Sequence, residues 1–172
     1  LTVLRMHSRV DRLLSFHHLG CLQIDPLRAV ENTQLLVAWS RLGDFDHAWL
    51  DRLAYEERRL FEYWAHAASL VPVEDAPLHR YRMERFRTDP DYEWFRPYLD
   101  WLRACEPTIG RILARIEAEG PLPTRAFYSL PLPALPRRGW TERDGMRMLV
   151  DLVWQQGHIL TSHRHGRARI WD

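Results

Sequence analysis

Two polar side chains, Gln23 and Asp25, stand two residues apart inside an otherwise apolar stretch, "CLQIDP". The proline that follows disfavours helical backbone for the residue before it, so Asp25 is expected to be extended. Alternate side chains of an extended segment share a face, which would place Gln23 and Asp25 on one side, roughly 7 Å apart at the backbone. Leu22, Ile24 and Cys21 surround them with apolar surface. The segment therefore presents an amide and a carboxylate together.

Hydrolysis of a glycosidic bond usually needs two carboxylates. One carboxylate and an amide can suffice when the leaving group is already cationic, because no proton need be delivered to it. Asp25 would then stabilise an oxocarbenium-like sugar and activate water, and Gln23 would position that water. Alternatively, Asp25 is only the N-cap of a helix that Pro26 starts, and Gln23 is incidental. Spacing alone favours the helix cap.

A second group of candidates is Tyr63, Trp64 and His66 in "EYWAHAAS". If this segment is extended, Trp64 and His66 share a face, which suits stacking on a base with a hydrogen bond beside it. The alternative is that Phe61, Tyr63 and Trp64 belong to a hydrophobic core, and we expect this of two of the three.

Basic residues concentrate near the end of the chain. Residues 137–172 contain seven arginines and four acidic residues, whereas residues 61–136 contain nine arginines and eleven acidic residues. The segment "ILTSHRHGRARIW" predicts a hairpin whose Arg164, Arg167 and Arg169 can contact phosphates through bidentate guanidinium groups. A merely solvated hairpin is the alternative. All 24 basic residues are arginine, so no lysine is present to form a Schiff base.

Metal, membrane and cofactor functions find no support in the sequence. Neither the nine histidines nor the two cysteines fall at metal-ligand spacings, so we predict no metal site. No apolar run approaches the roughly 20 residues of a membrane span. A reducing, cytoplasmic environment is the default expectation.

The two halves of the chain show the same order of elements. The first half predicts helices over 1–19, 29–43 and 44–59, then strands over 60–66 and 67–73 that pair as a hairpin or form one extended return. The second predicts a helix over 99–120, a short helix after Thr124, a proline-rich loop over 129–139, a helix over 141–157 capped by Thr141 and Asp144, and the final hairpin. Glycines at 20, 43, 120 and 157 end the predicted helices.

This order is typical of a winged helix. We therefore predict an α+β, mainly helical fold with tandem winged-helix (helix-turn-helix) domains at 1–85 and 86–172. The sequence begins as if inside a helix and ends as if inside a strand, so we expect a longer protein to continue beyond residue 172.

Several separated motifs resemble one family, the winged-helix DNA glycosylases of the YcaQ and AlkZ type, which repair alkylation damage and interstrand crosslinks. These motifs are "LGCLQIDPLRAV", "WSRLGDFD", "LDRLAYEERRLFEYWAHAASLVPVEDAPLHRYRM" and "LVWQQGHILTSHRHGRARIWD". The resemblance covers nearly the whole chain. It implies tandem winged helices, followed in the family by a β-rich C-terminal domain that is missing here. It also implies hydrolytic release of N7-alkylguanine, including crosslinked guanine, without metal or cofactor.

The resemblance also implies roles for individual residues. The motif Gln, apolar, Asp of the YcaQ-like branch matches Gln23 and Asp25, as water-positioning partner and as electrostatic stabiliser and water activator. Arg41, in "WSRLG", becomes a candidate phosphate contact. Position 31 departs from the pattern that the resemblance implies, which is an arginine or another non-acidic residue, because this chain carries Glu31. An acid exposed to DNA would repel it, which leaves the preferred substrate open.

The expected partner is damaged double-stranded DNA, bound by a monomeric, cytoplasmic, nucleoid-associated enzyme. Two alternatives remain at this point. One is a non-catalytic winged-helix transcriptional regulator, and the other is a structural domain in which Asp25 only caps a helix.

Overall fold

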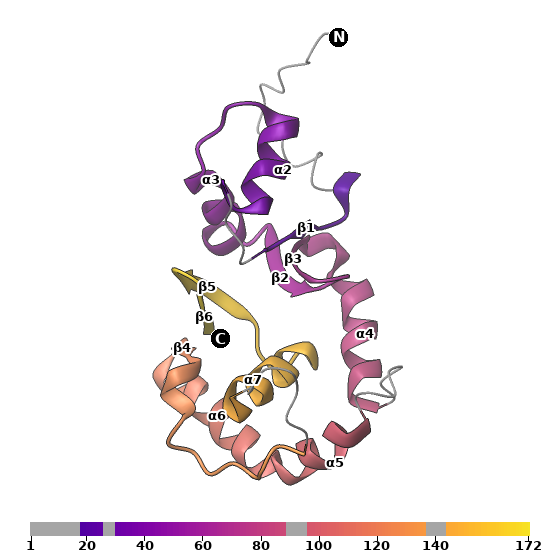
Figure 1. The fold of residues 1–172 in the computed structure, drawn as a ribbon, viewed down its shortest axis with the longest axis vertical. Helices are drawn as coiled ribbons and strands as arrows, with labels where there is room; N and C mark the ends of the chain where they lie inside the picture. The colour runs from indigo at the N-terminus through magenta and orange to yellow at the C-terminus, as the bar shows by residue number, and fades with distance from the viewer. Residues whose placement is uncertain (1–17, 26–29, 89–95, 137–143) are drawn as a thin grey trace. The chain divides into compact units, whose positions relative to one another are not determined.

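The computed structural model describes residues 18–25, 30–88, 96–136 and 144–172. The chain forms two compact units, Leu1–Pro77 and Leu78–Asp172. Each unit combines helices with a three-stranded antiparallel sheet, which confirms the α+β, mainly helical prediction (Figure 1). The predicted domain boundary after residue 85 falls within helix α4 (Ala76–Thr88). Nearly all of the helix predicted over 1–19 lies outside the described residues.

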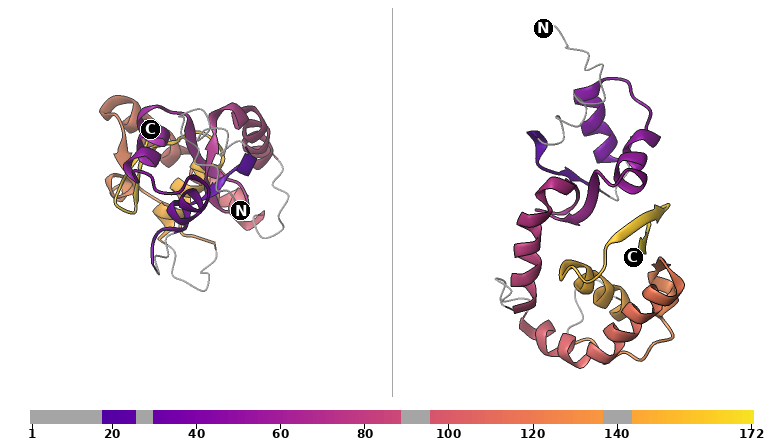
Figure 2. Two further views of the ribbon diagram at one scale, coloured as in Figure 1. Left: turned by 90° about the horizontal axis from the view of Figure 1, so that it is seen from above. Right: turned by 180° about the vertical axis from the view of Figure 1, so that it is seen from behind.

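The sheet of the first unit places its last strand in the middle. The elements of this unit are β1 (Leu22–Gln23), α2 (Thr33–Leu42), α3 (Ala48–Asp51), the π-helical turn η1 (Arg52–Glu56), β2 (Leu60–Trp64), β3 (Ala68–Pro72) and the 3-10 turn η2 (Val73–Asp75). The strand order is β1-β3-β2, and Figure 2 shows the sheet from two further directions. Strand β1 is therefore an edge strand that pairs with β3.

Local sequence signals set the ends of the helices in this unit. Gly43 ends α2 with φ 73°, a backbone conformation that glycine adopts at little cost. Asp46, one of two predicted caps, accepts the backbone N–H of Ala48 at 3.0 Å and pairs with Arg52 at 2.9 Å. These hydrogen bonds hold the pKa of Asp46 below its usual range, and the bond from Arg52 makes the largest contribution.

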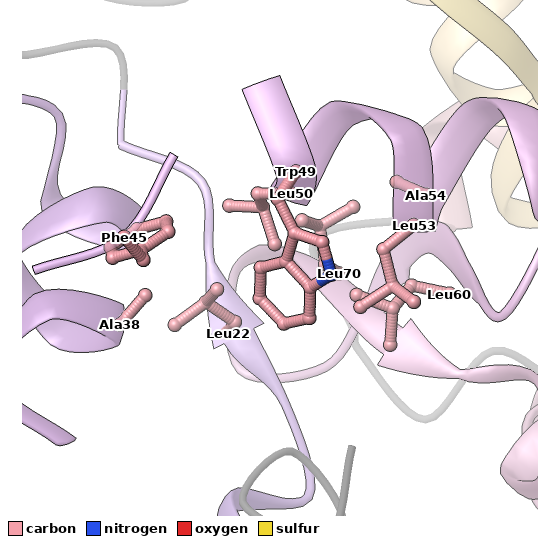
Figure 3. Packing of buried hydrophobic residues seen from close by; sticks show 9 residues of the cluster. All are labelled: Leu22, Ala38, Phe45, Trp49, Leu50, Leu53, Ala54, Leu60 and Leu70. Atoms are coloured by element: carbon pink, nitrogen blue, oxygen red, sulfur yellow. The ribbon is translucent and has the colours of Figure 1, made fainter. Parts of the chain in front are cut away.

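The apolar core around Leu22 lies on one face of the sheet, and on the other face Tyr63, Ser69 and Val71 are also buried. Leu22 of β1 is 1% exposed and packs in a cluster with residues of α2, α3, η1, β2 and β3. The cluster comprises Leu22, Ala38, Phe45, Trp49, Leu50, Leu53, Ala54, Leu60 and Leu70 (Figure 3). Burial of this apolar surface fixes β1 against the helices and so determines which of its side chains face away from the core.

Strands β2 and β3 form the hairpin that was one of two predicted arrangements. Trp64 pairs with Ala68, and the backbone N–H of Ala65 donates to the carbonyl of Ala67 at 3.0 Å. The turn therefore consists of residues 65–67. The prediction that the first strand continues to His66 is wrong, because this tight turn begins after Trp64 and places His66 at its centre.

The sheet of the second unit has the same strand order as that of the first. Its elements are α4, α5 (Arg96–Ala104), α6 (Glu106–Glu119), β4 (Leu122–Pro123), the 3-10 turn η4 (Thr124–Phe127), α7 (Gly145–Gln155), β5 (Thr161–His165) and β6 (Ala168–Trp171). The strand order is β4-β6-β5, so again the last strand lies in the middle. The hairpin predicted around "RHG" is confirmed, with its turn at residues 166–167.

Two predictions for this unit need correction. The single helix expected over 99–120 is two helices, because Pro107 lacks an N–H and restricts the residue before it, so α6 begins anew after Cys105. Thr124 starts a 3-10 turn, but its hydroxyl accepts the indole N–H of Trp171 at 2.9 Å instead of capping that turn. Strand β4, which was not predicted, pairs with β6.

Helix α7 is fixed at both ends. The carboxylate of Asp144 accepts the backbone N–H of Met146 at 3.0 Å, which confirms this predicted cap, whereas Thr141 lies outside the described residues. At the other end, Arg87 of α4 donates to the carbonyl of Gln156 at 2.8 Å. Gly157 follows with φ 73°, and a Cβ at this position would overlap the side chain of Met83. Helix α4 thus packs on the C-terminus of α7.

Candidate active site on strand β1

Gln23 projects from the face of β1 that is opposite to the core. Leu22 pairs with Leu70 and Gln23 with Ser69, and the backbone N–H of Ile24 donates to the carbonyl of Ala68 at 2.8 Å. Because Leu22 points into the core, its neighbour Gln23 must point the other way. The prediction of an extended segment around Gln23 is confirmed.

The imidazole of His66 lies against two side chains of this segment. Its Nε2 is 3.1 Å from Oε1 of Gln23, and its Nδ1 is 3.8 Å from Sγ of Cys21. Residues 21 and 23 therefore share a face, as alternation requires. Cys21, which was expected only to provide apolar surroundings, thus contacts the ring of His66. The signal that could have identified it is the same two-residue spacing that linked Gln23 to Asp25.

Asp25 is half-buried and lies two residues beyond Gln23. The helix start predicted after it falls on residues 26–29, outside the described residues, so the helix-cap alternative stays untested. Farther on, the carboxylate of Glu31 accepts the backbone N–H of Asn32 at 2.8 Å, just before α2. The unexpected acid therefore has a local role at the start of that helix.

A further carboxylate, Glu62, lies on the opposite face of the sheet. It pairs with Leu70, which in turn pairs with Leu22, and it is 1% exposed. The hydroxyl of Tyr55 donates to it at 2.5 Å. Since Gln23 points away from this face, Glu62 cannot act with Gln23 as the second acid of a two-carboxylate site.

The aromatic candidates separate by burial. Tyr63 is 1% exposed, and its ring centroid lies 6.3 Å from that of Phe61. It pairs with Ser69, which also pairs with Gln23, so Tyr63 is buried on the Gln23 face of the sheet. Trp64 is 36% exposed at the end of β2, next to the turn that carries His66. Base contact by Trp64 or His66 stays a prediction.

The four candidate phosphate contacts have different surroundings. Arg41 is exposed in the last turn of α2, where it donates to Ser40 Oγ at 3.0 Å. Arg167 is exposed in the turn of the β5–β6 hairpin, and Arg164 donates to its carbonyl at 3.3 Å. Arg169 instead pairs with Asp151 at 3.0 Å.

Arg169 also lies over an aromatic ring. Its Cζ is 4.2 Å from the ring centroid of Trp154, and its side chain is only 16% exposed. These contacts commit the guanidinium to the packing of the second unit, and phosphate contact by the four arginines stays a prediction.

Among residues 18–25, 30–88, 96–136 and 144–172, no group of three or more His, Cys, Asp or Glu side chains could hold a metal ion. Within the same ranges, no helix is long and apolar enough to cross a membrane.

Comparison with known proteins identifies the family. A family model described as DNA glycosylase AlkZ-like matches residues 16–172. This range includes the Gln23–Asp25 segment, the turn that carries His66 and the final hairpin. No solved structure matches the chain. The family match spans nearly the whole sequence, and on this evidence the chain belongs to the AlkZ-like DNA glycosylases.

Proposed function

We propose that this protein is a monofunctional DNA glycosylase that hydrolyses the N-glycosidic bond of cationic N7-alkylguanine, including guanine in interstrand crosslinks. The observation that carries the proposal is the family match over a segment whose Gln23 amide faces away from the core and is held by His66. Family membership also favours a glycosylase over a transcriptional regulator.

Alkylation at N7 makes the purine a good leaving group, because it departs as a neutral molecule. The sugar then develops positive charge, which the Asp25 carboxylate can stabilise while it accepts a proton from the attacking water. Gln23 can orient that water. No lysine is present in these 172 residues to act as the amine nucleophile of a β-lyase, which supports the monofunctional assignment.

We propose further that both units are winged helices. In each, an edge strand from earlier in the unit pairs with the last strand of the hairpin, as the orders β1-β3-β2 and β4-β6-β5 describe. We assign Arg41, Arg164 and Arg167 as phosphate contacts of these units. Exposed guanidinium groups at a helix end (Arg41) and in a hairpin turn (Arg167), with the half-buried Arg164 on the adjoining strand, suit sequence-independent binding to damaged duplex DNA.

The test is release of free base from duplex DNA that contains a single N7-methylguanine, measured under single-turnover conditions with the full-length protein. We expect release by the unaltered protein. Asp25→Asn combined with Gln23→Ala should slow it by about 100-fold or more, because both groups act on charge that develops only in the transition state. Affinity for the same DNA should change by less than about twofold.

Asp44→Asn is the matched control, since Asp44 is an exposed acid of the same unit outside the candidate site. It should leave the rate of release unchanged. Absence of base release by the unaltered protein would refute the proposed function. Release that survives the double change would refute the assigned residues. A large preference for one undamaged sequence over damaged DNA would instead indicate a regulator.

A further inference from the structure

The side chains of Cys21, His66 and Gln23 form a continuous chain of contacts on the face of β1 that is opposite to the core. Both ring nitrogens of His66 are used, Nδ1 at 3.8 Å from the Cys21 sulfur and Nε2 at 3.1 Å from the Gln23 oxygen. His66 reaches these two side chains from the turn at residues 65–67. The backbone hydrogen bond from Ala65 to Ala67 closes this turn. The motif segment is thus contacted by a residue 43 positions away in sequence.

The two contacts of the ring suit one tautomer of the neutral imidazole. The amide oxygen of Gln23 can only accept, so Nε2 of His66 must carry the hydrogen. In a neutral imidazole, Nδ1 then has the lone pair, which faces the weak S–H donor of Cys21. Both contacts therefore favour the same Nε2–H form.

From this geometry we propose that His66 is a positioning residue for Gln23, and that Cys21 selects its tautomer. A glutamine side chain alone can rotate to exchange its oxygen and nitrogen. Because His66 donates to the oxygen, the NH2 group remains to donate to the attacking water. The water oxygen then accepts from Gln23, and a proton of the water is directed to Asp25. This inference rests on the proposed function and deepens it.

His66 is exposed and is not part of the buried cluster of the first unit. An exposed hydrogen bond contributes little to folding, because water replaces it when it is lost. Removal of the imidazole should therefore leave the unit folded and change only how the amide is held.

Two isosteric changes separate the two ends of the ring. Glutamine places its NH2 group where Nε2 was, whereas asparagine places its NH2 group where Nδ1 was. We expect His66→Asn to slow single-turnover base release about 10- to 100-fold with less than about twofold change in DNA affinity, and His66→Gln to recover most of the loss. His47→Asn, at another exposed histidine of this unit, is the control and should have no effect.

The same change in the Gln23→Ala background shows whether His66 acts through Gln23. We expect His66→Asn to have no further effect there, because the amide that it positions is absent. An undiminished loss in that background, or a loss of DNA affinity in place of rate, would overturn the proposal and indicate direct contact with the lesion.

A spectroscopic measurement is independent of activity. The 15N shifts of the His66 ring in the unaltered protein at pH 8 should report the Nε2–H tautomer, and Cys21→Ala should shift the ring towards a mixture. Base release with a mixed tautomer in the unaltered protein would overturn this inference while leaving the proposed function intact. The Nε2–H tautomer without base release would refute the proposed function and retain the positioning contact.

Discussion

Replacing Arg169 by alanine tests whether an arginine of the β5–β6 hairpin supports the fold or binds DNA. Its guanidinium lies 4.2 Å from the ring centroid of Trp154 and 3.0 Å from a carboxylate oxygen of Asp151. The side chain is 16% exposed, in contrast to the exposed Arg167 two residues earlier. The two arginines are therefore a matched pair within one hairpin.

The magnitude follows from the contacts. A partly desolvated cation–π contact contributes about 0.5–2 kcal/mol. The ion pair adds about 1 kcal/mol at most, because the Asp151 side chain is 50% exposed and solvent screens the pair. We expect Arg169→Ala to lower the free energy of unfolding by about 2 kcal/mol, or the melting temperature by about 4–8 °C. Arg169→Lys should retain only part of this stability, because the ammonium group of lysine does not stack on a ring as a planar guanidinium does.

Urea unfolding and titration of duplex DNA at several salt concentrations measure the two effects separately. Arg167→Ala should change stability by less than about 0.5 kcal/mol and reduce the slope of log K against log salt by about 1. Arg169→Ala should leave that slope unchanged in its folded state. Equal stability of the two variants, together with a reduced slope for Arg169→Ala, would show that Arg169 binds phosphate and that its contacts in the fold contribute little.

Two further predictions concern the cysteines and a glycine. Burial raises the pKa of the Cys105 thiol to about 11, so only about one thousandth of this thiol is ionised at pH 8. Iodoacetamide should therefore label the native protein at Cys21 alone. Intact mass should show one adduct on the native protein, two after denaturation, and none on native Cys21→Ser. Gly157→Ala should lower thermal stability, because φ at this position is positive and the new Cβ would overlap the side chain of Met83. Adding Met83→Ala should recover the part of the loss that is due to overlap. Full recovery would show that alanine does not strain the backbone here.

Features that depend on neighbouring residues in the chain could be predicted from the sequence. The helix end at Gly43, the caps at Asp46 and Asp144, and the hairpin at Gly166 follow from backbone preferences and short-range hydrogen bonds. The extended backbone at Gln23 was also expected from the apolar alternation, although its pairing with β3 was not.

Features that depend on residues distant in the chain could not be predicted from the sequence. Strand β4 has two residues, one of them a proline, and exists because β6 pairs with it. The sequence shows the charge of Arg169 but not the indole beneath it. In the candidate site, the spacing of Gln23 and Asp25 was visible, whereas the contact with His66 depends on where the hairpin turns.

The pairing of β1 with β3 has a consequence for the accuracy of the site. Two residue pairs, Leu22 with Leu70 and Gln23 with Ser69, define the alignment of this edge strand. A shift by one residue would turn Gln23 into the apolar cluster and Leu22 to the face that carries His66, reversing the two faces at once. Burial of Leu22 thus sets the register of β1. Although Leu22 takes no part in the chemistry, it determines that Gln23 lies on the correct face.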